Sequence, residues 1–151
     1  MKSKTRSGLV SAVLLAGLLS VVMLGGCVAS PKTNTDTSAL SGTWVLKGFG
    51  APKGLTPPDP AVTTEMTLAD GKASGSGGVN TFSSDYEAKN NGSMRFGAVA
   101  ATLMAGPDAA MQQESEFFSA LEKTRHFEIY QGDLVLSALG NDTLVVMQRK
   151  K

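Results

Sequence analysis

The stretch GAVAATLMAGPDAAMQQESEFFSAL, residues 97–121, decides how the rest of this chain is organised. It predicts the end of a strand, a break at Gly106-Pro107 and then a helix over about residues 108–123, since proline disfavours helical backbone at the preceding residue. Asp108 is expected to cap this helix by accepting bonds from its first backbone N–H groups. Helical spacing places five residues on one face: Ala110, Glu114, Phe117, Phe118 and Leu121.

Short β-rich runs separated by turn residues make up most of the chain after residue 40. We expect strands at 43–47, 62–68, 72–76, 81–88 and 93–96, another over 98–104, and a three-strand meander over 127–148. Such strands need a partner layer to bury their apolar face, and the helix is the candidate. The predicted fold class is therefore α+β. We expect a small, predominantly antiparallel curved sheet or incomplete barrel, with one main α-helix packed on it.

Two features of these strands have competing interpretations. Trp44, the single tryptophan, is expected to anchor the core, and the alternative is an aromatic binding platform. Gly75, Gly77 and Gly78 resemble a phosphate-binding loop, but neither a Gly-Lys-Ser/Thr motif nor a helical pattern follows them. These glycines instead predict a bulge or a close approach between two backbone segments.

The N-terminal residues 1–26 have the pattern of a secretory signal peptide. Basic residues at positions 2, 4 and 6 precede an uncharged apolar run over 9–24, which ends at Leu24-Gly25-Gly26-Cys27. This ending looks like a bacterial lipobox, which implies that the signal peptidase recognises Leu24, Gly25 and Gly26 and that Cys27 is diacylated. The alternative is a membrane-spanning helix, but the run is shorter than the roughly 20 residues that a span needs.

Cleavage before Cys27 gives a lipid-anchored flexible tether over 27–40, rich in Thr and Ser, and one domain over 41–149. The expected location is the cell envelope. In a Gram-negative cell the non-acidic Val28 favours the outer membrane, on its periplasmic face. The mature chain keeps 11 basic and 13 acidic residues, a formal net charge of −2, which argues against a nucleic-acid partner. Cys27 is the only cysteine, so no intramolecular disulfide forms.

Residues with catalytic or metal-binding chemistry are sparse. The single histidine, His126, has no second ligand near it in the sequence, and the carboxylates lack the paired pattern of a glycosidase. We therefore predict neither an enzyme nor a cofactor. Glu114 interrupts the apolar face of the helix, where an unpartnered carboxylate is costly. It is expected either to accept structural hydrogen bonds from backbone N–H groups or, with Asn80, to form a polar contact site for a ligand or partner.

Several segments, in order, resemble the META domain of HslJ-like bacterial lipoproteins, a family that includes a heat-inducible lipoprotein. The resemblance covers about residues 40–149. The matching pieces are Gly42-Thr43-Trp44, Ser74-Gly75-Ser76, Asn80, Phe82, Thr102, Met104, Glu114, Phe117-Phe118, Leu121 and Gly132-x-Leu134-x-Leu136.

This resemblance implies a small, mostly antiparallel β domain with one packed helix. It also implies an envelope protein tied to stress or drug tolerance, without an established catalytic activity. The family often carries cysteines where this chain has Val79 and Gly106, and an arginine where it has Leu103. Since both cysteines are missing together, we predict that Val79 and Gly106 contact each other in space.

Two functions remain open at this point. In the first, the protein is a non-enzymatic, lipid-anchored envelope protein that acts through contacts with another envelope protein. In the second, it binds a small hydrophobic ligand between the sheet and the helix.

Overall fold

The computed structural model describes residues 33–151, so the predicted signal peptide and Leu24, Gly25, Gly26 and Cys27 lie outside the described residues. Residues 33–151 form ten strands, one α-helix and one short 3₁₀ helix. Their bounds are β1 Thr33–Asn34, η1 Thr37–Leu40, β2 Gly42–Phe49, β3 Glu65–Ala69, β4 Lys72–Ser76, β5 Thr81–Ala88, β6 Met94–Phe96, β7 Ala100–Ala101, α1 Asp108–Lys123, β8 His126–Tyr130, β9 Asp133–Ser137 and β10 Thr143–Arg149. Within the described residues, no helix is both long and apolar enough to cross a membrane.

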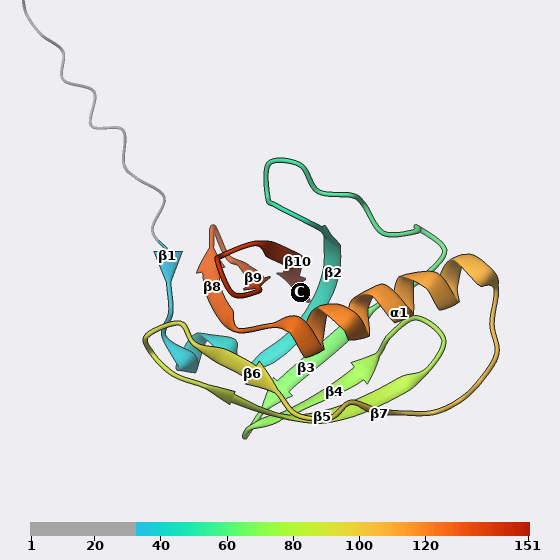
Figure 1. The fold of residues 1–151 in the computed structure, drawn as a ribbon, viewed down its shortest axis with the longest axis horizontal. Coiled ribbons are helices and arrows are strands. Elements are labelled where there is room, and N and C mark those ends of the chain that lie inside the picture. Colours follow the sequence, from blue (N-terminus) through green and yellow to red (C-terminus); the bar gives the residue numbers. More distant parts are fainter. Residues whose placement is uncertain (1–32) are drawn as a thin grey trace, which may run out of the picture.

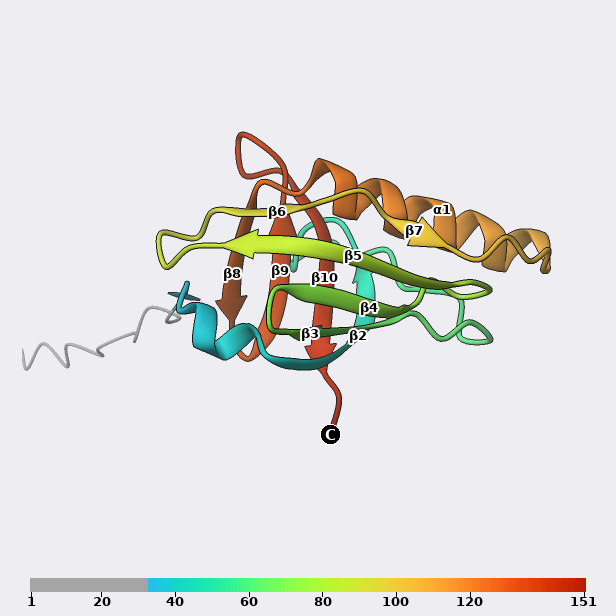
Figure 2. The same ribbon diagram turned by 90° about the horizontal axis from the view of Figure 1, so that it is seen from below.

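All ten strands belong to one antiparallel sheet, with α1 as the second layer. The strand order is β1-β8-β9-β10-β2-β3-β4-β5-β6, and β7 pairs with β5 beyond the end of β6. The sheet curls but does not close, and α1 lies along its open side (Figures 1 and 2). This arrangement confirms the predicted α+β class with one main helix packed on a curved sheet.

The margins of the sheet approach each other at one end only. The Met94 N–H donates to the Arg125 carbonyl at 3.1 Å, and the Phe127 N–H donates to the Gly92 carbonyl at 2.7 Å. Past β6 the chain moves away from β8, and α1 fills the space that opens there (Figure 2). The segment after β6 therefore faces the helix instead of another strand.

The core lies between the inner face of the sheet and α1. Trp44 is fully buried there, which confirms its role as a core anchor and excludes an exposed binding platform. Its indole Nε1–H donates to the Leu40 carbonyl at 2.8 Å, and the Arg149 guanidinium stands 4.3 Å from the ring centroid. On α1, Phe117 and Leu121 are completely buried, and Phe118 packs against the same cluster while partly exposed.

Residues 33–40 form ordered parts of the domain, unlike the flexible tether that composition predicts for 27–40. β1 pairs with β8, and the Thr37 N–H donates to the Asn90 Oδ1 at 3.0 Å. Leu40 is 1% exposed, because its side chain completes the core beside Trp44. The ordered domain therefore begins before the predicted boundary at residue 41.

The start of α1 differs in one detail from the prediction. The helix begins at Asp108 as expected, but Pro107 occupies the N-cap and no side chain caps the helix. Asp108 is instead the first helical residue, where its carboxylate favours the positive end of the helix dipole. The prediction that its side chain caps the helix is therefore wrong.

Candidate functional site

Glu114 and Asn80 form a buried hydrogen-bond network between α1 and the loop that joins β4 to β5. Glu114 is 5% exposed. Its Oε2 accepts from the backbone N–H groups of Val79 at 3.0 Å and Asn80 at 2.6 Å, and its Oε1 accepts from the Asn80 Nδ2 at 2.6 Å. Glu114 thus accepts hydrogen bonds from backbone N–H groups, as the first of its two predicted roles requires. Three donors also balance the charge that burial would otherwise penalise.

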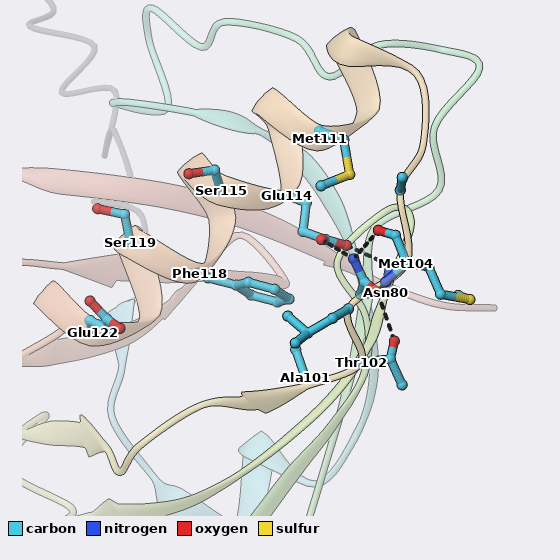
Figure 3. A pocket seen from close by; sticks show the side chains of 12 residues that line it. Asn80, Ala101, Thr102, Met104, Met111, Glu114, Ser115, Phe118, Ser119 and Glu122 are labelled. Carbon is cyan, nitrogen blue, oxygen red and sulfur yellow. Dashed lines mark hydrogen bonds between the residues drawn. The ribbon is translucent and has the colours of Figure 1, made fainter.

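Asn80 extends the network to the segment that follows β7. Its Oδ1 accepts from the Thr102 hydroxyl at 2.8 Å and from the Met104 N–H at 2.7 Å, while its Nδ2 also donates to the Met104 carbonyl at 3.2 Å (Figure 3). Beyond Thr102, whose N–H still donates to the Thr81 carbonyl of β5, the Asn80 amide therefore takes the place of a partner strand by bonding to both backbone groups of Met104. This explains why β7 ends at Ala101, although the sequence predicts a strand over 98–104.

Glycines make room for this network. A Cβ on Gly77 would lie 2.7 Å from the Glu114 Cγ and 2.7 Å from the Phe118 Cζ, and a Cβ on Gly75 would lie 2.0 Å from the Glu65 carbonyl oxygen. Both positions show the close approach predicted from the glycine pattern. A side chain at Gly77 would separate α1 from the loop, and one at Gly75 would separate β4 from β3, so both glycines are steric requirements of the structure around the site.

Gln113 belongs to the same buried polar layer, and sequence reasoning missed it. Its Nε2 donates to the Thr64 hydroxyl at 3.0 Å, and its Oε1 accepts from the Asp59 N–H at 2.7 Å. Its place four residues before Phe117, on the buried face of the helix, is the signal that could have identified it. Gln113 fastens the long loop before β3 to the helix.

An open groove lies between α1 and residues 101–105, above the network, and we call it the α1–β7 groove (Figure 3). Its volume is about 620 Å³. Apolar side chains dominate its rim: Leu103 is 99% exposed, Met104 53% and Met111 37%, with part-buried Phe118 at its base. Both predicted contact residues, Asn80 and Glu114, line this groove, but their polar atoms are used within the network.

The described residues contain no cluster with metal-binding geometry, and the single histidine packs against a turn. No group of three or more His, Asp, Glu or Cys side chains that could hold a metal ion occurs in residues 33–151. The His126 ring lies against Gly92, where a Cβ would be 2.3 Å from the ring Cε1. His126 thus serves the packing of the Asn91-Gly92 turn against β8.

Val79 and Gly106 are in direct contact, which confirms the predicted pair. A Cβ on Gly106 would lie 2.5 Å from the Val79 Cγ2 and 3.3 Å from the Val79 Cβ. The side chain of Val79 therefore fills the space that a second side chain would take. This contact joins the loop before β5 to the turn before α1, next to Asn80 and Ala105, which line the groove.

Replacing both residues with cysteine, Val79→Cys with Gly106→Cys, is expected to produce a disulfide under mild oxidation. The Cβ separation is close to the usual disulfide range of about 3.5–4.5 Å, and cutting Val79 back to cysteine removes the clash. Closing a loop of 28 residues gives roughly 3–4 kcal/mol of stabilisation by chain-entropy estimates. The measurement is a thiol titration and a thermal melt, with Cys27 removed and the domain expressed solubly. Persistent free thiols would show that the contact is not as described.

Comparison with known proteins identifies a family for most of the described chain and two solved structures with a similar fold. A family model for the META domain matches residues 37–151. A protein from Burkholderia xenovorans, solved by NMR, is similar over 81% of this chain and 92% of its own, with a TM-score of 0.65 and 22% identity. A DUF4847 family protein from Bacteroides vulgatus is similar over 74% of this chain and 94% of its own, with a TM-score of 0.53 and 19% identity. At these identities the solved structures support the fold alone. The search of curated proteins gave no match.

Proposed function

Because the chain belongs to the META domain family, we propose that it is a lipid-anchored cell-envelope protein that acts without catalysis, through protein contacts at the α1–β7 groove. The observation that carries this proposal is the exposed apolar rim of Leu103, Met104 and Met111 around one open groove. Exposed apolar clusters of this kind mark interaction sites. The family resemblance suggests that the contact serves stress or drug tolerance.

The position of the groove suits a protein held at a membrane by Cys27. Six residue steps separate Cys27 from Thr33, so the lipid lies within about 20 Å of β1. β1 lies at one end of the long axis of the molecule, and the start of α1 lies at the other (Figures 1 and 2). An anchored domain can thus present the groove away from its own bilayer, towards another envelope protein.

A small hydrophobic ligand is the second candidate, and the groove volume favours it. About 620 Å³ falls within the range of roughly 300–1,000 Å³ that ligand pockets occupy. However, such pockets bury most of the ligand surface, whereas Leu103 stands almost fully exposed. An open groove with an exposed rim leaves a small molecule in water and suits a polypeptide better.

Replacing Cys27 with serine is expected to abolish lipid attachment and to leave an unprocessed precursor. The lipobox ending and the single cysteine give the reason, because no other thiol in the chain can take the lipid. Labelling with a radioactive fatty acid and separating membranes from soluble protein measures both effects. A variant that matures and partitions with membranes as the wild type does would contradict the anchor.

Contact through the groove is tested with a photo-crosslinking amino acid at position 103 in the anchored protein. The matched control carries the same residue at position 139, which is 79% exposed on the turn before β10 and outside the groove. We expect an adduct with one envelope protein from position 103 and none from 139. Adducts from neither position, together with a lipid that co-purifies with the protein in mass spectrometry, would favour the ligand-binding alternative instead.

A further inference from the structure

Residues 102–105 follow β7, and the backbone edge of this segment that faces away from β5 is unpaired within the described residues. Thr102 donates its N–H to the Thr81 carbonyl at 3.1 Å, and Met104 donates its N–H to the Asn80 side chain. Peptide groups of an extended chain point alternately to either side, so the backbone groups of Leu103 and Ala105 face away from β5. Within residues 33–151, neither of these two residues makes a backbone hydrogen bond. An unpaired edge of this kind is a template for another strand.

This free edge forms one wall of the α1–β7 groove, and α1 forms the other. Residues 101–105 span at most about 13 Å, at roughly 3.3 Å per extended residue. Met111 and Glu122, which mark the ends of the helical wall, lie eleven residues apart, or about 16 Å at 1.5 Å per residue. The walls are therefore similar in length and match an extended segment of about four or five residues.

The side chains that line the groove indicate which side chains a bound segment should have. Met111 and Phe118 on the helix offer apolar contacts, whereas Glu122 at the end of the groove offers a negative charge. The helix is acidic: it carries Asp108, Glu114, Glu116 and Glu122, and its only basic residue, Lys123, does not line the groove. Alternate apolar side chains and one lysine or arginine would complement this lining.

We propose that the α1–β7 groove binds an extended segment of another envelope protein, which joins the edge at Leu103 and Ala105 as an added antiparallel or parallel strand. The main chain of the segment bonds to these two residues, every second side chain packs on Met111 and Phe118, and a basic residue pairs with Glu122. This strand-addition mode derives affinity from main-chain bonds and specificity from alternate side chains. The inference rests on the proposed function, because it names the kind of protein contact made there.

The Asn80 network prepares the edge for this partner. Asn80 bonds to both Thr102 and Met104, the neighbours of Leu103 on either side, so it holds the wall extended before any partner arrives. The wall residues that Asn80 holds therefore do not have to become ordered on binding, which lowers the entropic cost of association. Asn80 thus acts as a positioning residue for the binding edge.

The test begins with linear heptapeptides displayed on phage and selected on the lipidated protein in detergent. We expect enriched peptides to alternate apolar residues and to include a basic one. A synthetic copy of the best peptide is then N-methylated at one position at a time. At every second position, where the N–H faces the edge, methylation should weaken binding at least tenfold. At the positions in between, it should weaken binding less than threefold. Binding should also slow amide exchange at Leu103 and Ala105 at least tenfold.

Two outcomes would overturn strand addition: selection that enriches no peptide, or peptides whose affinity does not alternate with N-methylation. Glu122→Lys should weaken binding of the basic peptide, while the matched control Glu116→Lys, outside the groove, should leave it unchanged. A crosslink from position 103 to an envelope protein that persists despite either negative result would retain the proposed function and reject only this mode of binding.

Discussion

Replacing Glu114 with alanine is expected to lower the free energy of unfolding by about 3–5 kcal/mol. The carboxylate accepts three hydrogen bonds, from the N–H groups of Val79 and Asn80 and from the Asn80 side chain. Its loss leaves buried donors without an acceptor, and each such donor costs roughly 1–3 kcal/mol. Urea denaturation followed by tryptophan fluorescence measures the change, since Trp44 lies in the core.

Two further variants make this experiment specific. Glu116→Ala removes an exposed carboxylate from the same helix and should stay within about 0.5 kcal/mol of the wild type, as surface changes do. Glu114→Gln keeps the shape but turns one acceptor into a donor that faces other donors, so it should also destabilise. If Glu114→Ala were as stable as Glu116→Ala, the network would not hold the helix to the loop.

Replacing Phe117 with alanine is expected to cost about 3–5 kcal/mol, the range for a fully buried phenylalanine. Its ring is completely buried and meets the ring of Phe82 edge-on, with centroids 5.7 Å apart. Phe118 also meets Phe82, at 5.3 Å, but is partly exposed at the base of the groove. Phe118→Ala should therefore cost well under the cost of Phe117→Ala.

The same urea denaturation compares these two neighbours directly. Equal losses for Phe117→Ala and Phe118→Ala would show that α1 is rotated relative to the sheet. Losses below about 0.5 kcal/mol for both would mean that the helix does not cover the core.

The sequence predicted those elements whose signals are local. Gly106-Pro107 and the apolar spacing define α1, and its observed bounds of Asp108–Lys123 agree with the prediction. The Asp70-Gly71 turn has positive φ angles of 50° and 75°, as a tight hairpin requires, so β4 also has its predicted bounds. In these cases one or two residues determine the local backbone conformation, and this conformation sets where the neighbouring helix or strand begins.

The site depends on contacts between distant segments, and these could not be read from periodicity. Glu114 was identified as an anomaly on an apolar face, but its partners lie 34 and 35 residues away. The strand predicted over 98–104 stops at Ala101 because the Asn80 side chain replaces the partner strand there. The exposure of Leu103 follows from that replacement, so it became visible only in the structure.

Residues 33–40 show a related effect at the start of the domain. Their Thr- and Ser-rich composition favours a tether, yet Leu40 fills the core and its carbonyl accepts the indole N–H of Trp44. The buried Leu40, the pairing of β1 with β8 and the bond from Thr37 to Asn90 together tie this polar segment to the domain. Composition averages over a segment and does not detect such specific contacts.

The most direct test of the account is amide hydrogen exchange along residues 102–105, measured by NMR on the protein without a partner. The central claim is that Asn80 and the β5 strand hold this wall of the groove extended while its outer edge stays free. We predict alternation: the amides of Thr102 and Met104, which are hydrogen-bonded, should exchange at least 100-fold more slowly than those of Leu103 and Ala105. Equally fast exchange at all four positions would mean that the network does not hold the wall, and equally slow exchange would mean that the edge is not free.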